Sequence, residues 1–241
     1  MKESPHLDPN LPEHLATTLH ADPPEPGEDL TGRIQKACVL VPLAWRKGEW
    51  VIYFIRRSEE LRHHRRQVAF PGGIMETRDD SPRECALREA HEEIGLPSIA
   101  VNGLGYLDGT PTVTGFWIVP LVGVIRMEWP VKPDPIEVEK VFTVSLASLL
   151  DPENHVFDER EWRGQRYLVH VFDRKGESIW GATGRILCQL LKRIGIIYEL
   201  DMNWLEPPQG RRFWIPEDGF FRSAPERSGN ETESETNEGK R

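Results

Sequence analysis

The chain has 241 residues, with 30 lysines and arginines against 39 aspartates and glutamates, which gives a net charge of -9. This length predicts one main domain with extensions. The acidic balance excludes a protein that binds nucleic acid non-specifically through a broad positive surface. It does not exclude an anionic small molecule, because an acidic protein can hold a locally basic site.

The cysteines and the apolar segments bear on the compartment. The chain has three cysteines, Cys38, Cys85 and Cys188, and no CxxC pair, which is typical of reduced thiols packed in a core. The N-terminal residues show no basic and apolar leader, and the longest apolar run, Ala37–Trp45, is too short to span a bilayer. We therefore expect a cytoplasmic protein without a membrane-spanning segment.

The acidic charge is concentrated at the two ends of the chain. Residues 1–30 hold seven acidic side chains against one lysine, and also six of the twenty prolines. In this stretch a short amphipathic piece around Leu11–Leu19 can dock on the domain, whereas the composition of Asp22–Asp29 predicts a linker. The chain is predicted to divide into four segments: an N-terminal extension (1–30), a main domain (31–198), a C-terminal extension (199–222) and a disordered acidic tail (223–241).

The main domain begins with two predicted strands, Ala37–Ala44 and Trp50–Ile55, joined by a turn around Gly48. The stretch that follows, Arg56–Arg66, contains five arginines and two histidines against two glutamates. Two interpretations of it stay open: a solvated basic loop, or a loop that binds phosphate, whose oxygens match guanidinium groups in geometry and charge. The next stretch, Phe70–Gly73, ends in paired glycines, which let the backbone approach a ligand closely.

The next predicted element is a helix over Pro82–Ile94. Ser81 can cap its first turn, Pro82 fits the first helical position, and Glu84 completes a capping box. Gly95 is suited to end the helix, because glycine tolerates the left-handed conformation that is common after a last helical turn.

One face of this helix carries three carboxylates, Glu89, Glu92 and Glu93, since residues three and four apart are neighbours on a helix. Two interpretations are open: an ordinary solvated acidic face, or a site for a hard divalent cation, which prefers carboxylate oxygens and would neutralise the cluster. The basic loop and the Gly-Gly turn upstream favour the second, because the three features together fit a metal ion that bridges a phosphorylated substrate.

Downstream of this helix, apolar runs predict four more strands, at Val101–Leu107, Phe116–Arg126, Val138–Val144 and Tyr167–Phe172. A second helix is predicted over Ile179–Ile194, with Gly181 and Gly184 near its start, where close packing can require small residues. Many strands with two substantial helices predict a mixed sheet packed between helices, which is the α/β or α+β class.

The segment Arg88–Leu96 resembles the second half of the signature of the Nudix hydrolases, G-x5-E-x7-R-E-U-x-E-E-x-G-U with U an apolar residue, and it matches that half at every fixed position. The first half departs from the signature. Six residues separate Gly73 from Asp80 and seven separate Asp80 from Arg88, so the loop is interpreted as one residue longer, with Asp in place of Glu.

The loop ahead of the helix is similar to an additional signature of one Nudix subgroup, the coenzyme A pyrophosphatases, which runs L-L-T-x-R-[SA]-x3-R-x3-G-x3-F-P-G-G. Arg57-Ser58, Arg62 and Phe70–Gly73 match it at the right distances. The chain departs from it at Tyr53–Ile55, where an apolar strand is preserved, and at Arg66, which replaces a glycine and adds a charge beside the expected site.

The resemblance covers residues 33–197. It implies an α/β/α sandwich around a mixed sheet, and hydrolysis of the pyrophosphate linkage in a nucleoside diphosphate derivative with Mg²⁺ or Mn²⁺. For the subgroup the substrate is coenzyme A or an acyl derivative, which yields 3′,5′-ADP and a 4′-phosphopantetheine product. The partner is then a small molecule rather than a nucleic acid or a membrane, and a homodimer stays open as the assembly state.

By the same resemblance, Glu89 and Glu93 are the principal metal ligands, and Glu92 is a further ligand, directly or through water. The backbone carbonyl of Gly73 is expected to complete the metal shell. Arg88 is expected to orient the carboxylates by ion pairing rather than to touch the metal.

The other roles fall on the loops and on one later strand. Substrate binding is assigned to the basic loop and the glycine turn, that is to Arg57, Arg62, Gly72 and Gly73. The general base stays open among three glutamates, Glu92, Glu137 and Glu139. Either of the neighbouring aspartates, Asp79 or Asp80, could reach the metal.

Two other functions stay open. One is a Nudix hydrolase for another diphosphate, such as ADP-ribose, NADH or a damaged nucleotide, which the pattern over Arg57–Gly73 disfavours. The other is a non-catalytic Nudix-fold ligand sensor. Such proteins tend to lose the glutamates of the signature, whereas Glu89, Glu92 and Glu93 are all present.

Overall fold

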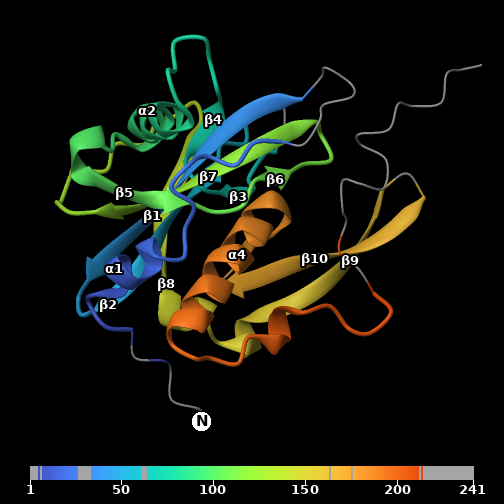
Figure 1. The fold of residues 1–241 in the computed structure, drawn as a ribbon. Coiled ribbons are helices and arrows are strands. Elements are labelled where there is room, and N and C mark those ends of the chain that lie inside the picture. The colour runs from blue at the N-terminus through green and yellow to red at the C-terminus, as the bar shows by residue number, and fades with distance from the viewer. Residues whose placement is uncertain are drawn as a thin grey trace, which may run out of the picture.

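The computed structural model describes residues 5, 7–26, 34–60, 64–162, 164–174, 176–211 and 213 (Figure 1). The helices are α1 (Leu11–Ala16), α2 (Pro82–Ile94), α3 (Leu146–Leu149) and α4 (Gly181–Ile197), with the short 3-10 turns η1 (Ser98–Ala100), η2 (Pro152–Asn154) and η3 (Asn203–Leu205). The strands are β1 (Gln35–Arg46), β2 (Glu49–Arg57), β3 (Val68–Ala69), β4 (Gly72–Ile74), β5 (Val101–Tyr106), β6 (Thr110–Pro111), β7 (Phe116–Ile125), β8 (Val138–Ser145), β9 (His155–Trp162), β10 (Gln165–Arg174) and β11 (Glu177–Ile179). Both predicted helices and all six predicted strands are present.

The main sheet is mixed. Strand β1 pairs in parallel with β7 and antiparallel with β2, while β5 adds antiparallel to β7 and β8 adds antiparallel to β2. The short strands β3, β4 and β6 pair with β2, β1 and β7. The β1–β2 hairpin turns through Lys47 and Gly48, whose φ angles of 51° and 84° are the positive values that tight hairpin turns need.

Helices cover both faces of this sheet. Successive side chains of a strand point to opposite faces, so Cys38 and Leu40 of β1 pack in one core with α2, whereas Val41 and Leu43 pack in the other core with α1 and α4. Gly72 and Gly73, which were predicted as a turn, instead begin strand β4 (Gly72–Ile74), because they pair with Val39 and Cys38 of β1. A loop connects β4 to α2. The predicted α/β/α sandwich around a mixed sheet is thereby confirmed.

A second, three-stranded antiparallel sheet, in the order β11–β10–β9, follows the main one and packs against α4 (Figure 1). A Cβ atom at Gly184 of α4 would lie 2.9 Å from the carbonyl oxygen of His170, so this glycine is required by close packing, as predicted. At Gly181 the same prediction is wrong, because no atom lies within 4 Å of an added Cβ and the residue instead has a positive φ of 64°. The helix itself begins two residues later than predicted. Ile179 ends β11 and is fully buried there, which explains why its apolar character resembled the start of the helix.

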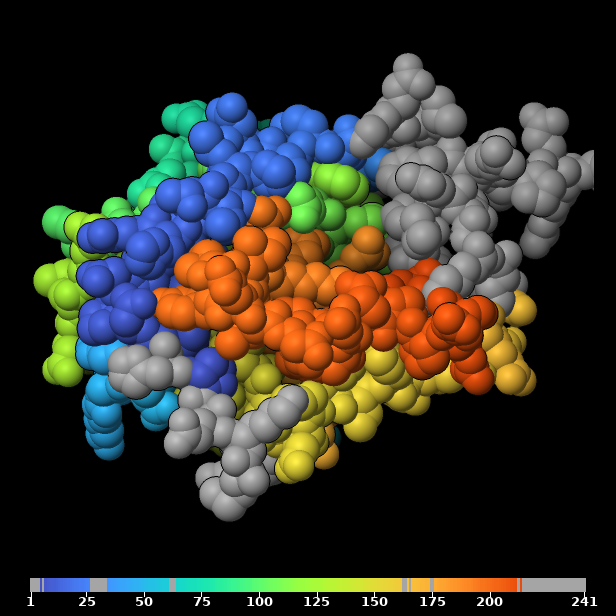
Figure 2. Space-filling model, turned by 60° about the horizontal axis from the view of Figure 1, so that its bottom comes forward, coloured from blue at the N-terminus to red at the C-terminus, as the bar shows by residue number. Residues whose placement is uncertain are grey.

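The N-terminal segment lies against α4, as Figure 2 shows, and its docking is the expected one. Leu11 and Leu15 are fully buried in the same core as α4. The backbone carbonyl of Asp8 accepts a hydrogen bond from the Trp50 indole (2.9 Å), and the Asp8 carboxylate accepts one from the Tyr198 hydroxyl (2.9 Å). The sheet and α4 therefore both hold this segment.

Some expectations fall on other parts of the chain. The predicted tail over 223–241 and the end of the linker over Asp22–Asp29 lie outside the described residues. The three cysteines are buried and free, as expected. No helix within the described ranges combines the length and the apolar character that crossing a membrane would require.

We expect Leu15→Ala to lower the free energy of unfolding by about 3 kcal/mol, because it removes a fully buried side chain and leaves a cavity. Urea denaturation of the variant and of the wild type measures this difference. His14→Ala, on the exposed face of the same helix, is the control and should change stability by less than about 0.5 kcal/mol. Equal stability of the two variants would show that α1 contributes nothing to the core.

Candidate active site

The site is built on α2, which begins and ends where predicted. Ser81 Oγ accepts a hydrogen bond from the Glu84 backbone N–H (3.2 Å), Pro82 occupies the first turn, and Gly95 has a left-handed φ of 69° at the C-cap. The Glu84 carboxylate accepts from the backbone N–H of Asp80 (2.9 Å), one residue earlier than in a capping box. Local capping thus fixes the position from which the helix presents its glutamates.

Glu93 is the most buried glutamate of α2, with a side chain that is 2% exposed. One carboxylate oxygen accepts a hydrogen bond from the Gly72 backbone N–H (2.9 Å), and the other lies 3.5 Å from Arg57 Nη1. Burial raises the pKa of Glu93 to about 8, although the Gly72 hydrogen bond and the Arg57 charge act in the opposite direction. The helix therefore places beside Gly72 a carboxylate whose burial disfavours its charged form.

Glu89, one helical turn earlier, packs directly on the other glycine of the turn. A Cβ atom at Gly73 would lie 2.5 Å from the Glu89 carboxyl carbon, so any side chain at this position would displace the carboxylate. Burial raises the pKa of Glu89, and the nearby charges of Glu92 and Glu137 add to this effect against the opposing ion pair with Arg88. Glu89 and Glu93 thus both face Gly72 and Gly73 of β4.

We expect Gly73→Ala to lower turnover at least about a hundredfold, because the added methyl group would displace the Glu89 carboxylate. Steady-state rates and thermal unfolding of the variant measure the effect. Gly48→Ala is the control: its hairpin φ of 84° makes alanine strained, but no atom lies within 4 Å of the new Cβ. It should lose about 1 kcal/mol of stability and keep its activity, and an active Gly73→Ala protein would contradict the inference.

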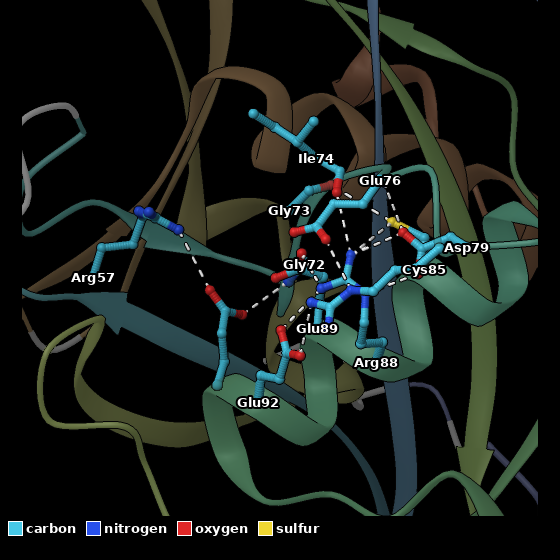
Figure 3. Close-up of polar contacts among 12 residues, drawn as sticks. Arg57, Gly72, Gly73, Ile74, Glu76, Asp79, Cys85, Arg88, Glu89 and Glu92 are labelled. Carbon is cyan, nitrogen blue, oxygen red and sulfur yellow. Dashed lines mark hydrogen bonds and ion pairs between the residues drawn. The ribbon is translucent and has the colours of Figure 1, made fainter.

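Arg88 connects three carboxylates near β4, those of Asp79, Glu89 and Glu92, as Figure 3 shows. Its Nε and Nη2 donate to the two oxygens of Asp79 (2.8 and 2.9 Å), and its Nη1 donates to Glu89 (2.8 Å) and Glu92 (2.9 Å). The hydrogen bond from Arg88 lowers the pKa of Asp79 to about 2. Arg88 therefore stays charged and holds the glutamates in place.

This geometry corrects the predicted alignment of the loop. Asp80 was expected at the position of the signature acid, yet Asp79 makes the bidentate contact with Arg88 and is buried, whereas Asp80 is exposed. The five residues between Gly73 and Asp79 equal the spacing of the family signature, so the additional residue lies between Asp79 and Arg88. Spacing alone left these two neighbouring aspartates equivalent. The side-chain contacts of Arg88 distinguish them.

The candidate bases occupy different environments. Glu92 is exposed and has two arginine partners, Arg88 and Arg78, the second of which sequence reasoning missed. Glu139 forms an ion pair with Arg56 (2.9 Å) on β2. The charge of Glu137 raises the pKa of both Glu89 and Glu93.

Backbone hydrogen bonds anchor the loop that carries Glu137 to Glu93 of α2 and to Ser58. The backbone N–H of Asp134 donates to the Glu93 carbonyl (2.9 Å), and the backbone N–H of Ser58 donates to the Glu137 carbonyl (2.8 Å). Ser58 follows Arg57, whose side chain contacts Glu93. These contacts join segments far apart in the sequence, so no local pattern could have separated Glu137 from Glu139.

The basic loop is described only in part. Arg57 reaches Glu93, as stated above, whereas Arg62 lies outside the described residues. Arg66 has a left-handed φ of 57° and forms an ion pair with Glu59. Glycine adopts such a conformation without steric cost, which accounts for the glycine that the coenzyme A pyrophosphatase signature has at this position.

The carboxylate oxygens near Gly72 and Gly73 are the kind of ligand that a hard divalent cation prefers. The described residues contain no group of three or more His, Cys, Asp or Glu side chains already arranged around one metal position. The buried carboxylate of Glu93 and the partly buried one of Glu89 nevertheless lie one turn apart, and the charge of Glu89 raises the pKa of Glu93. A cation between them would relieve this repulsion. Arg57 and Arg88 now supply part of that positive charge.

Comparisons with known proteins identify the family of the chain. A family model described as the NUDIX domain matches residues 35–166, which is more than half of the chain. The chain belongs to the Nudix family. Nudix hydrolases generally use divalent metal ions, and they act on nucleoside diphosphate derivatives.

Curated relatives carry the same family name. A protein named "Uncharacterized Nudix hydrolase NudL" from Photorhabdus laumondii is 34% identical, over 72% of this chain and 92% of its own length. Its namesake from Escherichia coli K12 is 35% identical, over 67% of this chain and 84% of its own length. A solved Nudix hydrolase from M. smegmatis, RenU, superimposes with a TM-score of 0.40 at 19% identity, over 46% of this chain and 70% of that chain. The family model and the curated relatives together show that the chain is a Nudix hydrolase.

Proposed function

We propose that this Nudix hydrolase cleaves the pyrophosphate bond of coenzyme A or its acyl derivatives with water, releasing 3′,5′-ADP and 4′-phosphopantetheine or its acylated form. One observation carries the proposal. Arg57 and Gly72, which belong to the motif similar to the coenzyme A pyrophosphatases, both contact Glu93 of the Nudix helix. The subgroup motif and the metal-ligand candidates therefore form one site.

The proposed roles follow from these contacts. Glu89 and Glu93 would hold Mg²⁺ or Mn²⁺ with the carbonyl of Gly73, and Glu92 would add a further ligand. When bound, the metal supplies positive charge to the phosphate oxygens and lowers the pKa of a bound water. Arg88, which is itself held by Asp79, orients Glu89 and Glu92 through its Nη1.

The remaining residues act on the water and on the substrate. Glu137 is our preferred general base, since its loop is hydrogen-bonded to the Glu93 backbone and its charge raises the pKa of both Glu89 and Glu93. Glu139 is less suited because Arg56 holds its carboxylate. Arg57 and Arg62 would bind phosphate oxygens of coenzyme A.

The test is a product analysis. The purified protein is incubated with coenzyme A and with Mg²⁺ or Mn²⁺, and the products are identified by mass. Formation of 3′,5′-ADP and 4′-phosphopantetheine is expected. A protein that leaves coenzyme A and acetyl-coenzyme A intact, while it hydrolyses another diphosphate of the same panel, would reject the substrate assignment.

The second candidate is a hydrolase for ADP-ribose or NADH. Arg66 favours it, because an arginine stands where the coenzyme A subgroup has glycine and places a further positive charge in the basic loop. The same substrate panel compares the candidates by kcat/KM. Preference for coenzyme A by about tenfold or more would decide for the first proposal.

A further inference from the structure

Glu92 is bound by two arginines from two different segments. Its Oε1 lies 3.1 Å from Arg78 Nη2, and its Oε2 lies 2.9 Å from Arg88 Nη1. Arg78 belongs to the loop between β4 and α2, and its Nε contacts Glu76 (2.8 Å). The roles assigned above use Arg88 but leave Arg78 without one.

The two arginines differ in how firmly they are held. Arg88 is 15% exposed and is fixed by the bidentate contact with Asp79. Arg78 is 56% exposed, and its acceptors Glu76 and Glu92 are 51% and 46% exposed. Exposed ion pairs contribute little free energy, and exposed side chains change rotamer within nanoseconds. Arg78 is therefore the partner that can leave Glu92 readily.

A metal ion on Glu92 would compete with this arginine. A divalent cation and a guanidinium group at the same carboxylate oxygen repel each other. A diphosphate substrate offers oxygens that match a guanidinium group in geometry and charge. The arginine that loses its carboxylate therefore finds a new anionic partner at the same site.

We propose that Arg78 is a substrate-phosphate-binding residue that rests on Glu92 in the metal-free enzyme and transfers to the diphosphate when the metal ion takes Glu92. This inference rests on the proposed function. It makes Arg78 a competitor of the metal before substrate binds and a contact of the substrate afterwards. Removal of its charge should therefore have opposite effects on the binding of metal and of diphosphate.

The first measurement is Mn²⁺ binding without substrate, followed by the EPR signal of free Mn²⁺. We expect Arg78→Ala to bind Mn²⁺ roughly two- to fivefold more tightly than the wild type, in line with the loss of an exposed ion pair. Arg83→Ala is the matched control, since Arg83 is exposed on α2 but lies against Gly103 of β5. It should leave Mn²⁺ affinity unchanged.

The second measurement is the binding of ADP at saturating Mn²⁺, followed by calorimetry. Arg78→Ala should weaken ADP binding about tenfold or more, as expected for a lost charge-assisted hydrogen bond, and Arg78→Lys should recover part of it. A merely structural role would weaken both ligands together. The proposal is overturned if Mn²⁺ affinity does not rise or if ADP affinity does not fall. Neither measurement needs turnover, so a failure to hydrolyse coenzyme A rejects only the substrate assignment.

Discussion

Glu93→Gln is expected to abolish nearly all metal-dependent turnover, with a loss of at least about a thousandfold in kcat. The amide has the size of the carboxylate but lacks the charge that would hold the metal ion. The fold should survive, because an amide oxygen can still accept the hydrogen bond from the Gly72 backbone N–H. Burial already disfavours the charged form of Glu93, so the neutral side chain suits the metal-free site.

Three readouts separate loss of the metal ligand from loss of the fold. Turnover is measured across a range of Mn²⁺ concentrations, metal affinity by calorimetry, and stability by thermal unfolding. Glu84→Gln is the control, because it places the same substitution at the exposed start of the same helix, where the side chain can still accept from the Asp80 backbone. Undiminished activity of Glu93→Gln would remove Glu93 from the metal ligands.

The parts of the fold that sequence could predict are those fixed by local chemistry. Helix α2 begins at Pro82 and ends at Ile94 as predicted, because Ser81 caps it and Gly95 tolerates a left-handed φ. The start of α4 was misplaced because Ile179 is equally suitable for a buried strand and for a buried helix face. Strand β9 was missed because its sequence, HVFDEREW, is mostly charged or aromatic and carries no long apolar run.

The parts of the site that sequence could not predict depend on contacts between distant segments. The signature placed Glu89, Glu92 and Glu93 on one helix, but it could not show that Glu93 is buried and Glu92 exposed. The choice between Asp79 and Asp80 needed the position of a guanidinium group. The protonation state of these carboxylates depends on their contacts with Arg57 and Arg88. The sequence motif therefore identifies the residues of the site but not their protonation or their partners.

A second large effect is expected away from the active site, from two buried histidines of the β9–β10 pair. His155 Nε2 and His170 Nδ1 share a hydrogen bond of 3.0 Å, and each side chain is less than one-tenth exposed. The rings of Phe157, Phe172 and Trp204 surround His155 at centroid distances of 4.8–5.2 Å. One imidazole donates and the other accepts, so the accepting ring must be neutral. Burial disfavours a charge on either ring.

Burial lowers the pKa of His155 to about 4, and it lowers the pKa of His170 to about 3, with smaller contributions from His155, Lys192 and Arg185. Both values lie below the ordinary value of 6.5, so the unfolded chain gains protons first as the pH falls. The stability that the neutral pair contributes is complete above about pH 7.5 and is lost as the pH falls through 6.5 toward 4. At pH 5 the loss is about 2 kcal/mol per histidine.

Glu93 acts in the opposite direction, because its raised pKa lets the folded state gain a proton before the unfolded chain does. The effect of the histidines must therefore be measured as a difference. We expect the double variant His155→Leu with His170→Leu to gain about 4 kcal/mol relative to the wild type between pH 7.5 and pH 5. Urea denaturation of both metal-free proteins at several pH values gives this difference.

The pH dependence isolates the histidines from any change in packing. A packing change in the double variant would shift its stability by a similar amount at every pH, whereas the proton effect grows as the pH falls. His91→Gln, which removes a histidine at an exposed position of α2, is the control for the loss of a histidine as such. The prediction rests on the burial of both rings among aromatic side chains, which disfavours a charge on them. Parallel curves for the double variant and the wild type would contradict it. They would mean that the buried rings take up protons as easily in the folded protein as in the unfolded chain.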